Sequence, residues 1–198
     1  MAYADDISAL GAEHLYEFDG NANDSIGSVN GTASGVAFTG TPICEDASNS
    51  MTTGSTSARL TIPDTNVITE IKSRKAFCGW FMTTAVQQPP TRIYGEGGTA
   101  QSISINLGFG NSLLFEVDLD GDAKQIFGDT DLVPNRSYHL TLVFLGTDFR
   151  NKVECYLDGV PQLDTQDDVP DVATIAARTP AVFGQSSVSV AIGSTELV

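Results

Sequence analysis

Apolar and polar residues alternate with a period of two along most of the chain, the pattern of β-strands that bury one face. The clearest run is SYHLTLVFLG, residues 137–146, in which Tyr138 and three further apolar residues share one face while His139 lies on the other. Residues 101–108 and 151–159 alternate in the same way. Shorter runs bring the expectation to roughly ten or more strands; they lie at residues 14–19, 57–63, 75–84, 91–97, 112–119, 181–185 and 188–193.

Turn signals separate these runs. The segments FDGNANDSIGSVNGTASG, GEGG, GFGNS, LDGD and LDGV are clusters of Gly, Asn and Asp, which reverse a chain between strands. The Asp-Gly pair at residues 158–159 predicts a tight hairpin that completes a three-stranded meander. Short strands with turns at this frequency predict an all-β fold, an antiparallel two-sheet β-sandwich of the jelly-roll type.

Two segments depart from the strand pattern. In the first dozen residues Ile7 and Leu10 recur at helical spacing, an Asp can cap the start and Gly11 can end the helix. We therefore expect a short N-terminal helical cap over residues 1–12. Residues 164–180 carry a run of acids and a proline, which predicts a long surface loop. The length of 198 residues suits a single domain over residues 13–198.

The charge balance narrows the choice of partners. Ten Lys and Arg against 25 Asp and Glu give a formal net charge of −15, which repels phosphate backbones and anionic lipid head groups. We therefore expect neither nucleic acid nor a membrane as a partner. The sequence has no apolar run of membrane-spanning length, and its start lacks the basic and apolar segments of a secretory signal. We expect a protein that does not use the general secretory route.

The three cysteines are odd in number, widely spaced and without a C-x-x-C pair. This pattern argues against a disulfide framework and against a structural zinc site. We expect Cys44, Cys78 and Cys155 to be reduced thiols in the core, where they behave as small apolar residues.

Three segments, in this order, resemble the concanavalin A-like lectin and glucanase superfamily, in particular its laminin G-like or pentraxin-like jelly rolls. Residues 14–38 are similar to the opening strand, the D-x-x-G…N-G-T loop and the second strand of those domains. Residues 75–84 match a strand with an aromatic residue before a polar end, and residues 137–163 match paired strands ending in Y-x-D-G. The family usually finishes with a G-x-x-D-x-[FILV] strand, whereas this chain reads VSVAIGSTELV, so the final strand is either supplied otherwise or missing, which would leave an open edge.

The opening MAYADDISALGAEHLYEFDG also resembles laminin G-like proteins encoded by tailed bacteriophages. The resemblance implies a non-enzymatic virion structural protein, either a capsid decoration or a tail- or fibre-associated module. Such a protein would assemble in bacterial cytoplasm and reside in the virion. Its partners would be other virion proteins or copies of itself, with host-surface glycans as a further class of ligand.

The stretch FEVDLDGDAKQIF, residues 115–127, is the first candidate metal site. Asp118, Asp120 and Asp122 stand at the first, third and fifth positions of an EF-hand-like spacing, which points to calcium. Ala123 stands where that loop needs glycine, and the flanking residues read as strands rather than helices. We therefore favour a hairpin that turns at residues 120–121, with its acids in solvent.

A second candidate is a sugar- or calcium-binding cluster near the N-terminus, since some relatives bind sugars through acidic loops. Polar side chains of the required kind gather in one loop, and they belong to Asp19, Asn21, Asn23 and Asp24. The same residues are typical of turns. Tyr94, Phe109 and Trp80 could stack on a sugar, although we expect Trp80, beside Phe81 in a strand, to be part of the core.

Catalytic patterns are incomplete in this sequence. The laminarinase branch of the superfamily carries E-x-D-x-x-E, whereas here Glu116 and Asp118 are followed by Gly121 at the third position. The only histidines are His14 and His139, and there is no G-x-S-x-G elbow. We therefore expect no catalytic residues, no enzyme activity and no resident cofactor. The alternatives are a calcium-dependent carbohydrate-binding module and a glycoside hydrolase whose carboxylates lie elsewhere.

Overall fold

The computed structural model describes most of the strands and the loops beside them. The described residues are 9, 11–39, 43, 49–53, 57–63, 75–83, 91–97, 101–107, 113–119, 122–127, 132–144, 153–162, 181–185 and 190–197. Among them, no helix has the length or apolar character needed to span a bilayer. The N-terminal helix expected over residues 1–12 falls almost wholly outside the described residues and is not supported by those that remain.

Most of the described residues form strands, as their period-two alternation predicts. These are β1 His14–Tyr16, β2 Thr32–Ser34, β3 Val36–Ala37, β4 Met51–Thr53, β5 Arg59–Ile62, β6 Lys75–Thr83, β7 Thr91–Gly97, β8 Gln101–Leu107, β9 Leu113–Leu119, β10 Asp122–Phe127, β11 Ser137–Phe144, β12 Val153–Leu157, β13 Val160–Pro161, β14 Ala181–Gln185 and β15 Val190–Leu197. The all-β prediction is confirmed.

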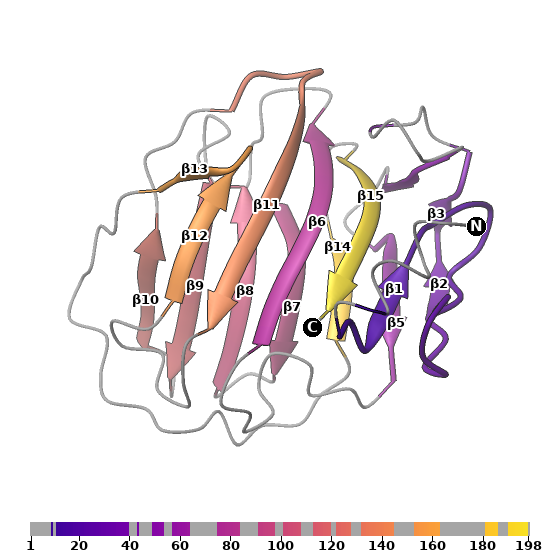
Figure 1. Ribbon diagram of the computed structural model, residues 1–198, viewed down its shortest axis with the longest axis horizontal. Coiled ribbons are helices and arrows are strands. Elements are labelled where there is room, and N and C mark those ends of the chain that lie inside the picture. Colours follow the sequence, from indigo (N-terminus) through magenta and orange to yellow (C-terminus); the bar gives the residue numbers. More distant parts are fainter. Residues whose placement is uncertain are drawn as a thin grey trace.

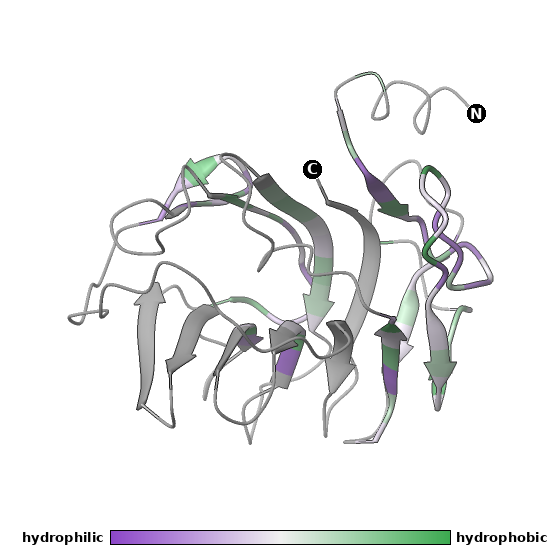
Figure 2. Cartoon of the chain, turned by 90° about the horizontal axis from the view of Figure 1, so that it is seen from below, coloured by the Kyte–Doolittle hydropathy of each residue, from purple (hydrophilic) through white to green (hydrophobic). Residues whose placement is uncertain are grey.

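The strands form two antiparallel sheets that stack as two layers (Figures 1 and 2). One sheet has eight strands in the order β13-β12-β11-β6-β15-β4-β3, with β1 paired to β15. The other has seven strands in the order β10-β9-β8-β7-β14-β5-β2. Each sheet therefore combines strands from the first and last parts of the chain, as in a sandwich closed by its ends.

Aromatic and aliphatic residues from both sheets fill the space between the layers. The rings of Phe77 on β6 and Tyr94 on β7 join the two sheets, with centroids 4.9 Å apart. Phe81 and Tyr138 form a second ring pair on the neighbouring strands β6 and β11, with centroids 5.8 Å apart. Each large apolar side chain buried in this way stabilises the fold by about 1.5–3 kcal/mol. The core is therefore the interface between the two sheets, and the alternate residues of β6, β11 and β12 face outward.

The predicted meander is present. Strands β11, β12 and β13 are neighbours, and Asp158 and Gly159 connect the last two with φ of 51° and 76°. Two positive φ values in a two-residue connection define the hairpin turn that suits the strand twist. The predicted hairpin of β9 and β10 also forms, with Leu119 opposite Asp122, while residues 120–121 lie outside the described residues.

The last strand lies inside a sheet. Strand β15 pairs with β6 on one side and with β4 and β1 on the other, so its edges are covered (Figure 1). The open edge considered for this part of the sequence is therefore not found at β15. The family's terminal pattern is absent, yet Ile192 and Leu197 still pair with Phe81 and Phe77 of β6, because strand pairing needs only backbone groups.

Candidate binding site

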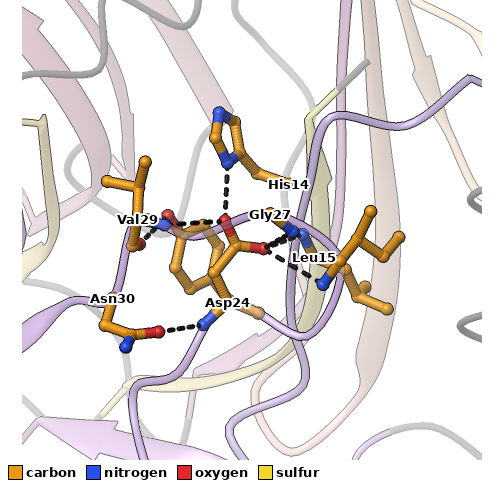
Figure 3. Close-up of polar contacts among 8 residues, drawn as sticks. His14, Leu15, Asp24, Gly27, Val29 and Asn30 are labelled. Carbon is orange, nitrogen blue, oxygen red and sulfur yellow. Dashed lines mark hydrogen bonds and ion pairs between the residues drawn. The ribbon is translucent and has the colours of Figure 1, made fainter.

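Asp24 is the centre of the loop between β1 and β2. Its carboxylate accepts hydrogen bonds from Nδ1 of His14 at 2.7 Å and from four backbone N–H groups (Figure 3). Those groups belong to Leu15 at 3.1 Å, Ile26 at 3.3 Å, Gly27 at 2.9 Å and Val29 at 3.3 Å. The side chain of Asp24 is 0% exposed, so these five bonds replace its hydration. A buried carboxylate satisfied in this way fixes the path of the loop.

Further bonds hold the same loop closed. The N–H of Asp24 donates to Oδ1 of Asn30 at 3.0 Å, and the hydroxyl of Tyr16 donates to the carbonyl of Val29 at 2.8 Å. Gly27 must be small, because a Cβ there would lie 2.7 Å from the carbonyl oxygen of Glu13. These contacts hold the loop against β1.

The surroundings of Asp24 set its protonation. Burial alone would raise the pKa of this carboxyl, but hydrogen bonds from His14, Leu15, Gly27 and Val29 outweigh it and leave the pKa below its usual value. Burial and the nearby charge of Asp24 raise the pKa of Tyr16 well above its ordinary value. The carboxylate therefore stays ionised and the phenol stays a hydrogen-bond donor.

The N-terminal ligand candidates do not converge on a common point in this structure. Asp24 points into the loop, and Oδ1 of Asn21 accepts the N–H of Asn23 at 2.7 Å, which is a local turn. Oδ1 of Asp19 accepts a bond from Asn49 at 2.9 Å on the surface. A cation held by Asp24 would have to displace its five donors. The described residues contain no group of three or more His, Cys, Asp or Glu side chains that could hold a metal ion.

The other candidates are placed as follows. Tyr94 has no exposed surface and packs on Phe77, so its ring belongs to the core and is not presented for stacking on a sugar. Asp118 and Asp122 lie in β9 and β10, at the ends of the hairpin, and their side chains, like Asp120 and Phe109, lie outside what the structure describes.

The outward face of the eight-stranded sheet carries several partly exposed rings on adjacent strands. Trp80 on β6 lies directly opposite His139 on β11, with ring centroids 4.9 Å apart and planes 55° apart. Tyr156 on β12 lies opposite Thr141, the next outward residue of β11. These side chains are half-buried, whereas their neighbours Phe81, Leu140 and Leu157 are buried in the core. We call Trp80, His139, Thr141 and Tyr156 the aromatic platform.

Charged groups edge the platform at both ends. The hydroxyl of Tyr156 donates to Oε2 of the exposed Glu154 at 2.8 Å. This bond, with some burial and the nearby charge, raises the pKa of Tyr156. At the other end Asp158 accepts the N–H of His139 at 2.8 Å and pairs with Arg136 at 2.9 Å. Aromatic side chains with a few polar groups beside them are a common lining of ligand-binding sites.

The outward face of the other sheet is covered at β8, whereas Arg59 of β5 is exposed. Ser104 and Asn106 of β8 point away from the core, since Ile105 between them pairs with the core residue Tyr94. They are nevertheless only 6% and 8% exposed, and Asn106 donates to Ser104 at 2.7 Å. Arg92 lies across Gly95 on the same face, where a Cβ would come within 2.8 Å of its Cδ. The described side chains on this face include no aromatic ring, so the platform is the better candidate for stacking on a ligand.

Trp80 corrects one expectation from the sequence. We expected it in the core beside Phe81, but adjacent residues of a strand face opposite ways, so Trp80 faces outward when Phe81 faces inward. The period-two alternation of β6 already contained this information.

The cysteines also differ in their positions. Cys155 is in the core, where burial raises its pKa to about 12. Cys78 is half-buried on the outward face, which corrects the expectation of a core thiol, and Cys44 lies outside the described residues.

Comparison with solved structures places the fold among β-sandwiches of the jelly-roll type. Domain 4 of AbnA, a GH43 extracellular arabinanase from Geobacillus stearothermophilus in complex with arabinotriose, aligns with a TM-score of 0.70 at 14% identity, covering 94% of this chain and 91% of that one. Trypanosoma rangeli sialidase in complex with sialic acid gives a TM-score of 0.68 at 13% identity, covering 95% of this chain and 30% of that one. The binding domain of botulinum neurotoxin serotype G gives 0.65 at 13% identity, covering 95% and 47%.

The chain thus spans nearly all of the arabinanase domain but less than half of the sialidase and of the neurotoxin binding domain. No protein-family model and no curated protein matches the sequence. At these identities the likeness establishes the β-sandwich fold alone, because unrelated functions share such folds.

Proposed function

We propose that this protein is a non-enzymatic binding module that recognises glycans on the aromatic platform. The observation that carries the proposal is the outward, half-buried Trp80 held against His139 beside Tyr156. The faces of aromatic rings are electron-rich, and the C–H face of a sugar ring is electron-poor, so the two stack. The polar groups of Glu154 and Thr141 lie within the same surface to bond hydroxyls.

Two similar folds support this choice of ligand. The arabinanase domain is in complex with arabinotriose and the sialidase with sialic acid. Similar β-sandwiches therefore occur in proteins that bind glycans. We propose no enzyme role, because Gly121 stands where the glucanase pattern has its third carboxylate.

Trp80 makes the proposal directly testable, because it is the only tryptophan in the chain. Titration with arabinotriose, cellotriose, sialyllactose and purified bacterial surface polysaccharides should shift its fluorescence when one of them binds. In calorimetry, Trp80→Ala should lose that binding, while the matched control Val160→Ala, at an exposed site on β13, should retain it. Binding that is unchanged in Trp80→Ala, or no binding by any glycan, would overturn the proposal.

The finer setting that we propose is the virion of a tailed bacteriophage. The support is the resemblance of residues 1–20 to laminin G-like phage proteins, together with the acidic charge. Glycan recognition would then serve adhesion of the particle to its host. Mass spectrometry of purified particles should detect the chain at a fixed copy number, and a chain found only outside particles would exclude this setting.

A further inference from the structure

We infer that Glu154 and Tyr156 make the platform selective for sugars without acidic groups, so that neutral and amino sugars bind and uronic and sialic acids do not. This inference rests on the proposed function, and it goes further by naming the ligand class and the residues that determine it. It follows from the hydrogen-bonding capacity and charge at one end of the platform.

The hydrogen bond between Tyr156 and Glu154 has a defined direction. The hydroxyl of Tyr156 donates its proton to Oε2 of Glu154 at 2.8 Å, and the raised pKa of Tyr156 keeps that proton in place. A phenol has one proton to donate and a carboxylate has none. The pair therefore offers acceptor lone pairs to a ligand and no donor.

The Glu154 end of the platform is negatively charged. Glu154 is exposed at this end, and the described residues place no cation against it; the cation of the platform, Arg136, lies at the opposite end and is paired with Asp158. The chain as a whole carries a net charge of −15. A sugar hydroxyl or a protonated sugar amine would be attracted here, whereas a sugar carboxylate would meet a like charge and receive no hydrogen bond from the Glu154–Tyr156 pair.

The pair also has a defined position on the platform. Tyr156 lies opposite Thr141, and Thr141 Oγ1 lies 3.5 Å from Nδ1 of His139, the ring that packs on Trp80. Three adjacent strands thus carry the stacking surface and the acceptor pair on a diagonal: Tyr156 lies two strands from Trp80, at about 4.8 Å per strand, and one outward row further along the sheet. A short oligosaccharide stacked on Trp80 would extend over Tyr156 and present its substituents to Glu154.

The test uses three probes with one β-1,4-linked backbone: trimers of glucose, of glucosamine and of glucuronic acid. Fluorescence of Trp80 in the full chain should give a dissociation constant on the order of tenfold weaker for the acidic trimer than for the neutral one. The glucosamine trimer should bind at least as tightly as the neutral trimer. The gap should narrow at high salt, since exposed charges are screened.

Two charge-matched variants complete the experiment. Glu154→Gln should reduce the tenfold gap to about threefold or less, whereas Glu13→Gln, which removes the same charge from an exposed site away from the platform, should keep it. Equal binding of acidic and neutral trimers, or an unchanged gap in Glu154→Gln, would overturn the inference and leave the proposed function standing. If no trimer and no glycan of the wider panel binds, the proposed function itself fails.

Discussion

Nδ1 of His14 lies 2.7 Å from Oδ2 of Asp24, and this pair fastens the loop after β1 to the strand that precedes it. The imidazole is one of five donors to a carboxylate without exposed surface. An acid in a glycine- and asparagine-rich loop thus acts as a structural centre. Substitution of Asp24 should therefore lower the stability of the fold rather than weaken the binding of a ligand directly.

Asp24→Ala should lower the free energy of unfolding by about 3 kcal/mol, because it leaves buried backbone N–H groups without an acceptor. Urea denaturation followed by circular dichroism measures this change. Asp19→Asn is the matched control; Asp19 makes an exposed bond to Asn49, so the change there should stay within about 0.5 kcal/mol. Equal losses in the two variants would contradict the role of Asp24.

Acid should weaken the fold through the same carboxyl. The ordinary pKa of this group is 3.8 and its folded pKa is lower, so its stabilisation is complete above pH 3.8 and is lost as the pH falls through the folded value. The difference in unfolding free energy between the natural chain and Asp24→Asn should therefore shrink from about pH 6 to about pH 2. A difference that stays constant over this interval would show that Asp24 is not responsible.

Gly159→Ala should destabilise the hairpin between β12 and β13 by about 1–2 kcal/mol. The cause is backbone strain alone, because φ at Gly159 is 76° and nothing lies within 4 Å of an added Cβ. Thermal melts report the loss, with Val160→Ala as the neighbouring control that keeps the backbone conformation. A melting temperature equal to that of the natural chain would show that the hairpin relaxes at no cost.

His139→Ala should shift the fluorescence maximum of Trp80 to longer wavelength, because the imidazole packs against the indole at a centroid distance of 4.9 Å and its removal exposes more of the indole to water. Emission spectra of the two proteins measure this shift. His14→Ala changes the other histidine of the chain and should leave the emission maximum unchanged. A shift in His14→Ala but not in His139→Ala would contradict this packing.

The strands were predictable because alternation is a local property of the sequence. Residues 101–108 and 137–146 read as strands, and β8 and β11 occupy nearly the same positions. The aromatic platform was not predictable in this way, because Trp80 and His139 become neighbours only when β6 pairs with β11. Asp24 was misleading for a related reason: its donors come from β1 and from its own loop, and only the folded loop shows that the carboxylate is fully bonded.

The pairing of β1 with β15 has a mechanical consequence. His14 lies opposite Leu197 and Tyr16 opposite Thr195, so the start of one strand and the finish of the other sit at the same corner of the sheet (Figure 1). Tension applied between residues 14 and 197 would peel the two strands apart one hydrogen bond at a time rather than shear all of them together. Once β1 has separated from β15, the force would act on the loop around Asp24. The hydrogen bonds of this carboxylate would then resist further extension of the chain.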